Sequence, residues 1–227
     1  MVSAWANQNQ MVLVQLATDE KSNEITAIPE LLEALDITGT IITTDAMSCQ
    51  KEIVKKIIEK QADYTIALKE NQPTLYKDVR DYFSSAITEK QFYPEVSSIQ
   101  TTEKGHGRIE RRTYYLSTEI DWLENRTDWA GLAAIGMVHS HVERNGMISE
   151  ENRYYITSLV DVKQFASAVR SHWGIENSLH WCLDMTFHED YSRIRKDHSA
   201  ENMAVVQHMA LNVLKQHPAK ISFARKR

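Results

Sequence analysis

The sequence has 227 residues, of which 42% are hydrophobic and 25% are charged, as in an ordinary folded protein. This length suits one large domain, or a core with an inserted subdomain. The formal net charge of −5 argues against a protein whose whole surface attracts nucleic acid, although basic patches can still surround an acidic site.

Two cysteines, Cys49 and Cys182, lie far apart and form no Cys-x-x-Cys pair. They argue against a disulfide framework or a structural zinc site. No apolar run approaches the roughly 20 residues that cross a bilayer, and the N-terminus lacks the basic region of a signal peptide. We expect a cytoplasmic protein in a reducing setting, with no membrane partner.

The first 70 residues alternate between predicted strands and helices. Pro29 suits the first turn of a helix, and lysines alternate with isoleucines in the next predicted helix as in an amphipathic segment. The predicted strands are 1–6, 11–17, 40–44 and 64–68, and the predicted helices are 27–35 and 50–60. A hairpin followed by this alternation indicates the α/β class, with helices packed on a mixed sheet.

In the remaining residues the predicted secondary structure changes from helix to strand and then back to helix. A helix is expected over 74–90, and helical spacing returns from Asp161 and again over 199–216. Between them, strands are predicted at Ile109, 113–116, 132–142 and 154–156, separated by turn residues. We therefore expect a core of residues 1–94, a β-rich insertion of 95–158 and C-terminal helices in 159–227.

Asp45 is the first candidate for chemistry. It follows the predicted strand 40–44, and the carboxyl ends of parallel strands are where open α/β sheets place their ligands. The alternative is an Asp that caps the helix expected to begin near Ser48. Position alone leaves both open.

Glu176 is the second candidate. It lies three residues after Trp173 and seven after Val169, which places it on the apolar stripe of its own helix. A carboxylate directed at a core usually has a partner or a metal, because burying it unpaired is expensive. An ion pair with Arg170 or Arg153 would also satisfy it.

Two acids from separate elements could hold a pair of Mg²⁺ ions for phosphodiester displacement. Such sites normally need a third carboxylate, and none of the other candidates occupies the centre of an apolar strand. These candidates are Asp19, Asp63, Asp184 and Asp190. A zinc site made of His172, His180, Cys182 and His188 is disfavoured, because residues two apart on a helix point to different faces.

Basic residues suggest contacts with phosphates. Lys104, His106 and Arg108 lie in a predicted loop that two glycines make flexible. The accessible backbone and the positive charge of this loop suit contact with phosphates. Lys69 and Asn71 follow a strand end on the same rim as Asp45. A solvated surface is the alternative for the three loop residues, whereas the position of Lys69 and Asn71 favours contact with the DNA backbone.

Motifs spread along most of the chain resemble the H-repeat-associated transposases of bacterial insertion sequences, in the DDE superfamily. The segments that carry the resemblance are Thr18-Asp19-Glu20-Lys21-Ser22-Asn23-Glu24-Ile25 with Ile28-Pro29, Thr44-Asp45-Ala46-Met47, Cys49-Gln50-Lys51-Glu52-Ile53, Lys69-Glu70-Asn71-Gln72, Gly105-His106-Gly107-Arg108, Arg170-Ser171-His172-Trp173-Gly174-Ile175-Glu176-Asn177 and Leu179-His180-Trp181 with Leu183-Asp184. No single motif carries it.

The resemblance implies an RNase H-like fold with a β-rich insertion before the last catalytic helix. It also implies Mg²⁺- or Mn²⁺-dependent cleavage and transfer of DNA strands, with Asp45 as the second acid and Glu176 as the third. We expect Arg170, His172 and Trp173 to contact DNA, although the position of Trp173 favours core packing over stacking on a base. The implied partners are transposon ends, target DNA in the nucleoid and further copies of the chain.

The sequence departs from the family near the N-terminus. The resemblance places the first of the three catalytic acids in an Asp-Gly-Lys segment there, and the sequence lacks this segment. We therefore expect an N-terminally truncated, inactive form with weak metal binding. Two alternatives remain: a DNA-binding remnant without catalysis, and a metal-dependent hydrolase of another substrate.

Overall fold

A computed structural model describes residues 2–16, 24–105, 107–175, 178–179, 181–188, 191–194 and 196–218. The chain divides into two compact units. The larger unit is Asp36–Val169, and the smaller one combines Met1–Leu35 with Arg170–Arg227.

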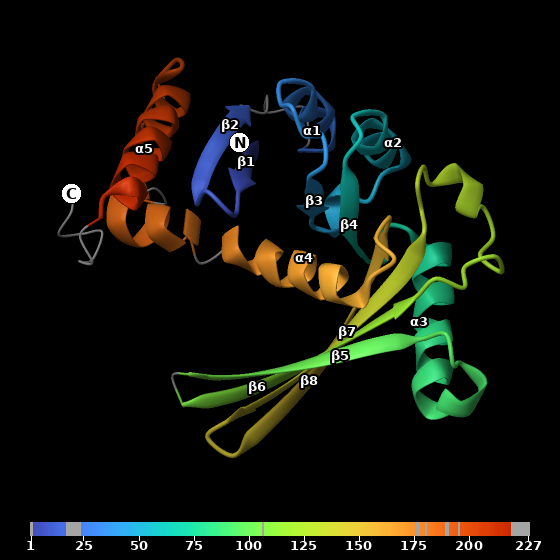
Figure 1. Cartoon of the computed structure of the whole chain (residues 1–227). Helices are drawn as coiled ribbons and strands as arrows, with labels where there is room; N and C mark the ends of the chain where they lie inside the picture. The colour runs from blue at the N-terminus through green and yellow to red at the C-terminus, as the bar shows by residue number, and fades with distance from the viewer. Residues whose placement is uncertain are drawn as a thin grey trace. The chain divides into compact units, whose positions relative to one another are not determined.

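The larger unit is built on a six-stranded mixed sheet (Figure 1). In spatial order its strands are β3 (Ile41–Thr44), β4 (Asp63–Leu68), β8 (Met147–Thr157), β7 (Ala134–Arg144), β6 (Arg108–Ser117) and β5 (Ser97–Gly105). β3 pairs with β4 in parallel, and every other pair is antiparallel. The strands of the predicted insertion thus continue the sheet that β3 and β4 begin, and the division into domains stays a prediction.

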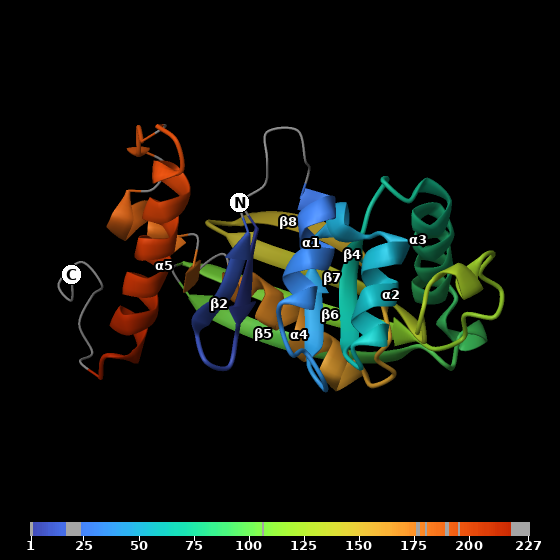
Figure 2. The same ribbon diagram turned by 90° about the horizontal axis from the view of Figure 1, so that it is seen from above.

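Helix α2 (Lys51–Glu59) connects the two parallel strands, and α3 (Pro73–Thr88) follows β4. α2 lies beside β4 in the view from above (Figure 2), and α3 contacts β8. The amphipathic pattern predicted for α2 is confirmed, because Ile53, Val54 and Ile57 are buried while its lysines are not. Short 3₁₀ helices occupy Ala46–Ser48 (η1), Lys90–Phe92 (η2) and Arg126–Asp128 (η3).

The first half of α4 (Val162–Ile175) completes the core of this unit. Its apolar residues pack on the sheet beside aromatic side chains, and the ring of Phe165 meets Tyr114 and Tyr155 edge to face. The buried cluster consists of Tyr114, Leu116, Ala134, Val138, Tyr155, Phe165, Ala166 and Val169. Burial of these large apolar side chains is the main force that holds the helix on the sheet.

The smaller unit contains the hairpin of β1 (Val2–Ala6) and β2 (Met11–Leu16), together with α1 (Glu24–Glu33), a π-helical segment (Leu183–Phe187) and α5 (Ser199–Gln216). A two-stranded hairpin is marginal by itself. Here the Asn212 amide of α5 donates to the Val12 carbonyl and accepts from its N–H, each at 2.9 Å. Leu211 and Leu183 bury against the same strand.

The predicted fold class is confirmed: a mixed sheet flanked by helices, consistent with the RNase H-like expectation. One strand was not expected. β5 contains a single large apolar residue, Ile99, because it lies at the edge of the sheet and its side chains are mostly in solvent. In the part of the chain that the structure describes, no helix is both long and apolar enough to cross a membrane.

Candidate metal and nucleic-acid site

Two neighbouring strand ends form the candidate site. β3 and β4 run in parallel with Thr44 opposite Ile66, so both carboxyl ends reach the same edge of the sheet. Asp45 follows the first strand, and the loop Lys69–Gln72 follows the second. This edge is where parallel α/β sheets bind ligands, as expected from the sequence.

Asp45 precedes the short helix η1 with an extended backbone, at φ −74° and ψ 178°. Its side chain makes no hydrogen bond that caps this helix. The contact made by its carboxylate is a long one, in which the Ser48 hydroxyl donates to Oδ1 at 3.4 Å. The cap interpretation therefore lacks its defining bond, and the exposed carboxylate is available to a ligand.

The loop after β4 reaches across to the turn that bears Asp45. Asn71 donates from Nδ2 to the Ala46 carbonyl at 2.7 Å, and Gln72 donates from Nε2 to the Cys49 carbonyl at 2.9 Å. The first of these residues was expected to contact DNA, and the second was not singled out. An Asn-Gln pair directly after a buried strand was the available signal, but its partner could not be read from the sequence.

Asp45 is chemically suited to a hard divalent cation, because such ions prefer oxygen ligands. The nearby Cys49 is not, since it is fully buried and burial raises the pKa of its thiol to about 12. Among the described residues, no group of three or more His, Cys, Asp or Glu side chains is placed to hold a metal. Asp45 would thus be one ligand of a larger set.

Glu176, His180 and His106 lie outside the described residues, as do Asp19 and Asp190. Helix α4, which precedes Glu176, begins at a capped end, where Asp161 Oδ2 accepts from the Gln164 N–H at 3.0 Å. Arg170 is exposed on this helix, while His172 and Trp173 are half-buried. Arg153, named above as a partner for Glu176, forms an ion pair with Glu151 at 2.8 Å.

Cys182, a member of the disfavoured zinc set, lies in the apolar cluster of the smaller unit with Leu179 and Leu211. Burial raises the pKa of its thiol, which opposes the thiolate form that binds metals. Asp184 is half-buried, and Asp63 accepts from the Ser158 hydroxyl at 2.7 Å at the opposite end of β4.

The basic residues of the β5–β6 hairpin differ in their partners. Arg108 forms an ion pair with Glu110 at 3.0 Å, and Arg112 lies between Glu110 and Glu103. Lys104 is exposed and forms no ion pair with any residue that the structure describes. Lys69, on the rim beside Asp45, is likewise exposed.

The sequence matches the family model described as "Transposase DDE domain" over residues 1–213. It is 43% identical over 220 residues to "Putative transposase YncI" of Escherichia coli O157:H7, covering 95% of the chain and 56% of that relative. It is 41% identical over 223 residues to "H repeat-associated putative transposase YhhI" of Escherichia coli strain K12, covering 94% of the chain and 57% of the relative. The chain therefore spans a little more than half the length of these relatives.

Proposed function

Because the chain belongs to the DDE transposase domain family, we propose that Asp45 and Glu176 hold Mg²⁺ or Mn²⁺ for the cleavage and transfer of DNA strands. The position of Asp45 carries this proposal. Its exposed carboxylate follows the carboxyl end of β3 and makes no cap hydrogen bond, so it can serve as an oxygen ligand. The names of the relatives at about 41–43% identity refer to the same class of protein.

Each residue has a separate task in this proposal. When bound, a pair of divalent ions activates the attacking oxygen and stabilises the leaving oxygen of a phosphodiester. Asp45 supplies an anionic ligand from the strand end, and Glu176 supplies a second one from the segment after α4. Lys69 on the same rim as Asp45 neutralises a phosphate of the DNA backbone.

Further basic and aromatic residues are proposed to bind the transposon ends and target DNA. They are Lys104, His106, Arg108, Arg170, His172 and Trp173. Lysine and arginine side chains position a protein on the phosphate backbone without reading sequence. Since DDE transposases act on paired ends, we expect further copies of the chain to take part.

The amount of activity depends on a third carboxylate. The resemblance places it in an Asp-Gly-Lys segment, which the 227 residues do not contain. With two anionic ligands the attraction for a divalent ion is weaker than with three. We therefore propose that the 227-residue chain alone binds the ions weakly and transfers DNA strands poorly.

The test is Mn²⁺ binding to the whole chain, measured by electron paramagnetic resonance, together with nicking of a supercoiled plasmid in Mg²⁺ or Mn²⁺. Asp45→Asn and Glu176→Gln should each weaken Mn²⁺ binding by about tenfold or more, because each removes one anionic ligand. The matched control is Asp63→Asn, which removes a carboxylate at the other end of the neighbouring strand.

Equal Mn²⁺ affinity in the wild-type chain and in Asp45→Asn would refute the proposed role of Asp45. Salt-sensitive DNA binding that survives both substitutions, with no metal-dependent nicking in any variant, would favour a DNA-binding protein without catalysis. Metal-dependent hydrolysis of other substrates, without DNA binding, would favour the remaining alternative.

A further inference from the structure

We infer that Asn71 and Gln72, here called the amide pair, position Asp45 by fixing the turn that bears it. This inference rests on the proposed function of Asp45 as a metal ligand. It assigns the amide pair to positioning, without contact between these side chains and metal or DNA.

The turn depends on few bonds of its own. It is a three-residue 3₁₀ helix, Ala46–Ser48, and helices of this kind have poorer hydrogen-bond geometry than α-helices. Within the turn, the Ser48 N–H donates to the Asp45 carbonyl at 3.3 Å, and the Cys49 N–H donates to the Ala46 carbonyl at 3.0 Å. Such a short element is held in place mainly by its surroundings.

The amide pair adds one bond at each end of this turn. The Ala46 carbonyl, one residue after Asp45, accepts from Asn71 as well as from the Cys49 N–H. The Cys49 carbonyl, at the other end, accepts from Gln72. Ala46 is 6% exposed and Cys49 is fully buried, so these carbonyls have little access to water as an alternative partner.

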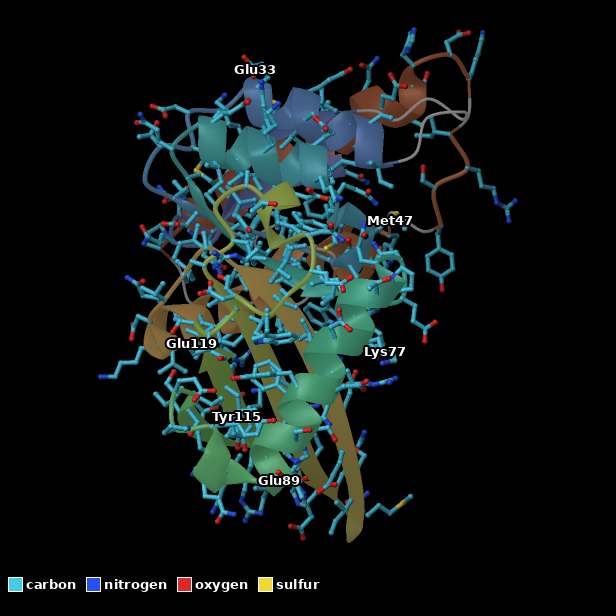
Figure 3. The ribbon with its side chains drawn as sticks, turned by 90° about the vertical axis from the view of Figure 1, so that its right-hand side faces the viewer. Glu33, Met47, Lys77, Glu89, Tyr115 and Glu119 are labelled. Carbon is cyan, nitrogen blue, oxygen red and sulfur yellow. The ribbon has the colours of Figure 1, made fainter. Side chains whose placement is uncertain are left out.

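The amide pair is itself firmly held. Gln72 donates its N–H to the Lys69 carbonyl at 3.1 Å and accepts from the Tyr76 N–H at 2.8 Å, at the first turn of α3. Pro73 occupies the first turn of α3, where its missing N–H costs nothing. Figure 3 labels Met47 in the turn and Lys77 in α3, the two parts that the pair connects. The loop thus joins the turn to β4, which pairs with a strand on each side, and to a 16-residue helix.

Asp45 needs such support because its own contacts do not fix it. Its carboxylate is exposed, and the Ser48 hydroxyl is 3.4 Å away. A metal ligand must be held within about 0.5 Å of its working position by the groups behind it. The direction of the Asp45 side chain therefore follows from the backbone of the turn, which the amide pair fixes.

Three measurements on the full chain test this inference. Asn71→Leu and Gln72→Met keep the approximate shape of the side chains and remove their amides. The loss of one hydrogen bond of ordinary strength should weaken Mn²⁺ binding by about three- to tenfold. Iodoacetamide should modify Cys49 faster, and amide hydrogens of residues 46–50 should exchange faster, while circular dichroism shows that the variants remain folded.

Lys69→Ala is the control from the same loop, and Cys182 is the internal control for alkylation, both read by peptide mass spectrometry. The alkylation of Cys49 should not change in Lys69→Ala, and the affinity of this variant for Mn²⁺ should not fall, because the substitution removes a positive charge and no ligand. DNA affinity should fall in Lys69→Ala and stay constant in Asn71→Leu. A lower DNA affinity in Asn71→Leu with unchanged Mn²⁺ binding would overturn the inference and make Asn71 a DNA contact.

The results separate the inference from the proposed function. If Asp45→Asn weakens Mn²⁺ binding but the amide-pair variants alter neither Mn²⁺ affinity nor Cys49 alkylation, the inference is wrong and the proposed function stands. If Asp45→Asn binds Mn²⁺ normally, the proposed function fails. In that case, faster alkylation of Cys49 in the amide-pair variants would still support the conclusion that the amide pair fixes the turn. Unchanged alkylation would overturn that conclusion.

Discussion

Gly136 in β7 lies against the ring of Phe165 in α4, so closely that a Cβ atom on Gly136 would be 2.4 Å from the Phe165 Cζ atom. Phe165 is fully buried at the centre of the larger unit's core. The ring has no room to retreat, because Tyr114 and Tyr155 meet it edge to face. The missing side chain of Gly136 thus sets the distance between helix and sheet.

We predict that Gly136→Ala lowers the free energy of unfolding by about 1–3 kcal/mol, since overpacking a filled core forces side chains or backbone to move. Urea denaturation followed by circular dichroism measures the change. Gly105→Ala is the control, because nothing lies within 4 Å of a Cβ atom at that position. Equal midpoints for the two variants would contradict the packing argument.

The second prediction concerns the buried hydroxyl of Thr157 in β8. It donates to the Tyr64 carbonyl at 2.7 Å, accepts from the Leu159 N–H at 3.1 Å and lies 2.9 Å from the Thr65 hydroxyl. Thr157→Val keeps the volume and leaves these buried groups without their partner, which should cost about 1–3 kcal/mol of unfolding free energy. The exposed Thr102, changed to valine, should give a much smaller loss in the same urea titration.

A third prediction follows from the pair of His141 and Glu150 on neighbouring strands. Glu150 Oε1 lies 2.9 Å from His141 Nδ1, and this hydrogen bond is the largest cause that lowers the pKa of Glu150 from its ordinary value of 4.5. A carboxyl whose pKa is lower in the folded state stabilises the fold above pH 4.5, and that contribution is lost as the pH falls through the folded-state value.

His141→Ala should therefore raise the pKa of Glu150 toward 4.5, as measured by NMR titration of its side-chain carboxyl carbon. His139→Ala is the matched control. His139 lies two residues away on the same strand and bonds to Asn152 at 2.8 Å, so its influence on Glu150 is through charge alone. A larger shift in His139→Ala than in His141→Ala would rule out the hydrogen bond as the main cause.

Local patterns in the sequence predicted most of the larger unit. The alternation of lysine and isoleucine predicted α2, because one face of that helix is buried. The Ile-Ile-Thr-Thr run before Asp45 predicted β3 through its β-branched residues, although β3 lies at the edge of the sheet and is only half-buried. The other edge strand, β5, was missed because it has one large apolar residue and no buried face. The family resemblance stated from scattered motifs is confirmed.

The candidate site was predictable only in part. The place of Asp45 follows from the order of strands and helices, which the sequence shows. The contact of Asn71 with the Ala46 carbonyl joins residues 25 apart, and depends on how two loops meet in space. No periodicity encodes such a contact, so Asn71 was expected on DNA and Gln72 was overlooked. The placement of Glu176 stays a prediction.

The last prediction concerns DNA binding by the β5–β6 hairpin. Lys104 forms no ion pair with a described residue, whereas Arg108 pairs with Glu110 at 3.0 Å. A lysine that neutralises one phosphate releases counterions, so its removal should lower the slope of log affinity against log salt by about 1. Arg108→Ala should change the slope less, because Glu110 already offsets part of its charge.

Fluorescence anisotropy of a labelled duplex between 50 and 200 mM KCl, roughly the range in which such slopes are resolved, measures both variants. Lys77→Ala is the control, since Lys77 lies on α3 and pairs with Asp81 at 3.0 Å. An unchanged slope in Lys104→Ala would remove this hairpin from the proposed DNA surface. If Lys69→Ala still lowered the slope, the DNA contacts would centre on the rim beside Asp45, where the proposed chemistry takes place.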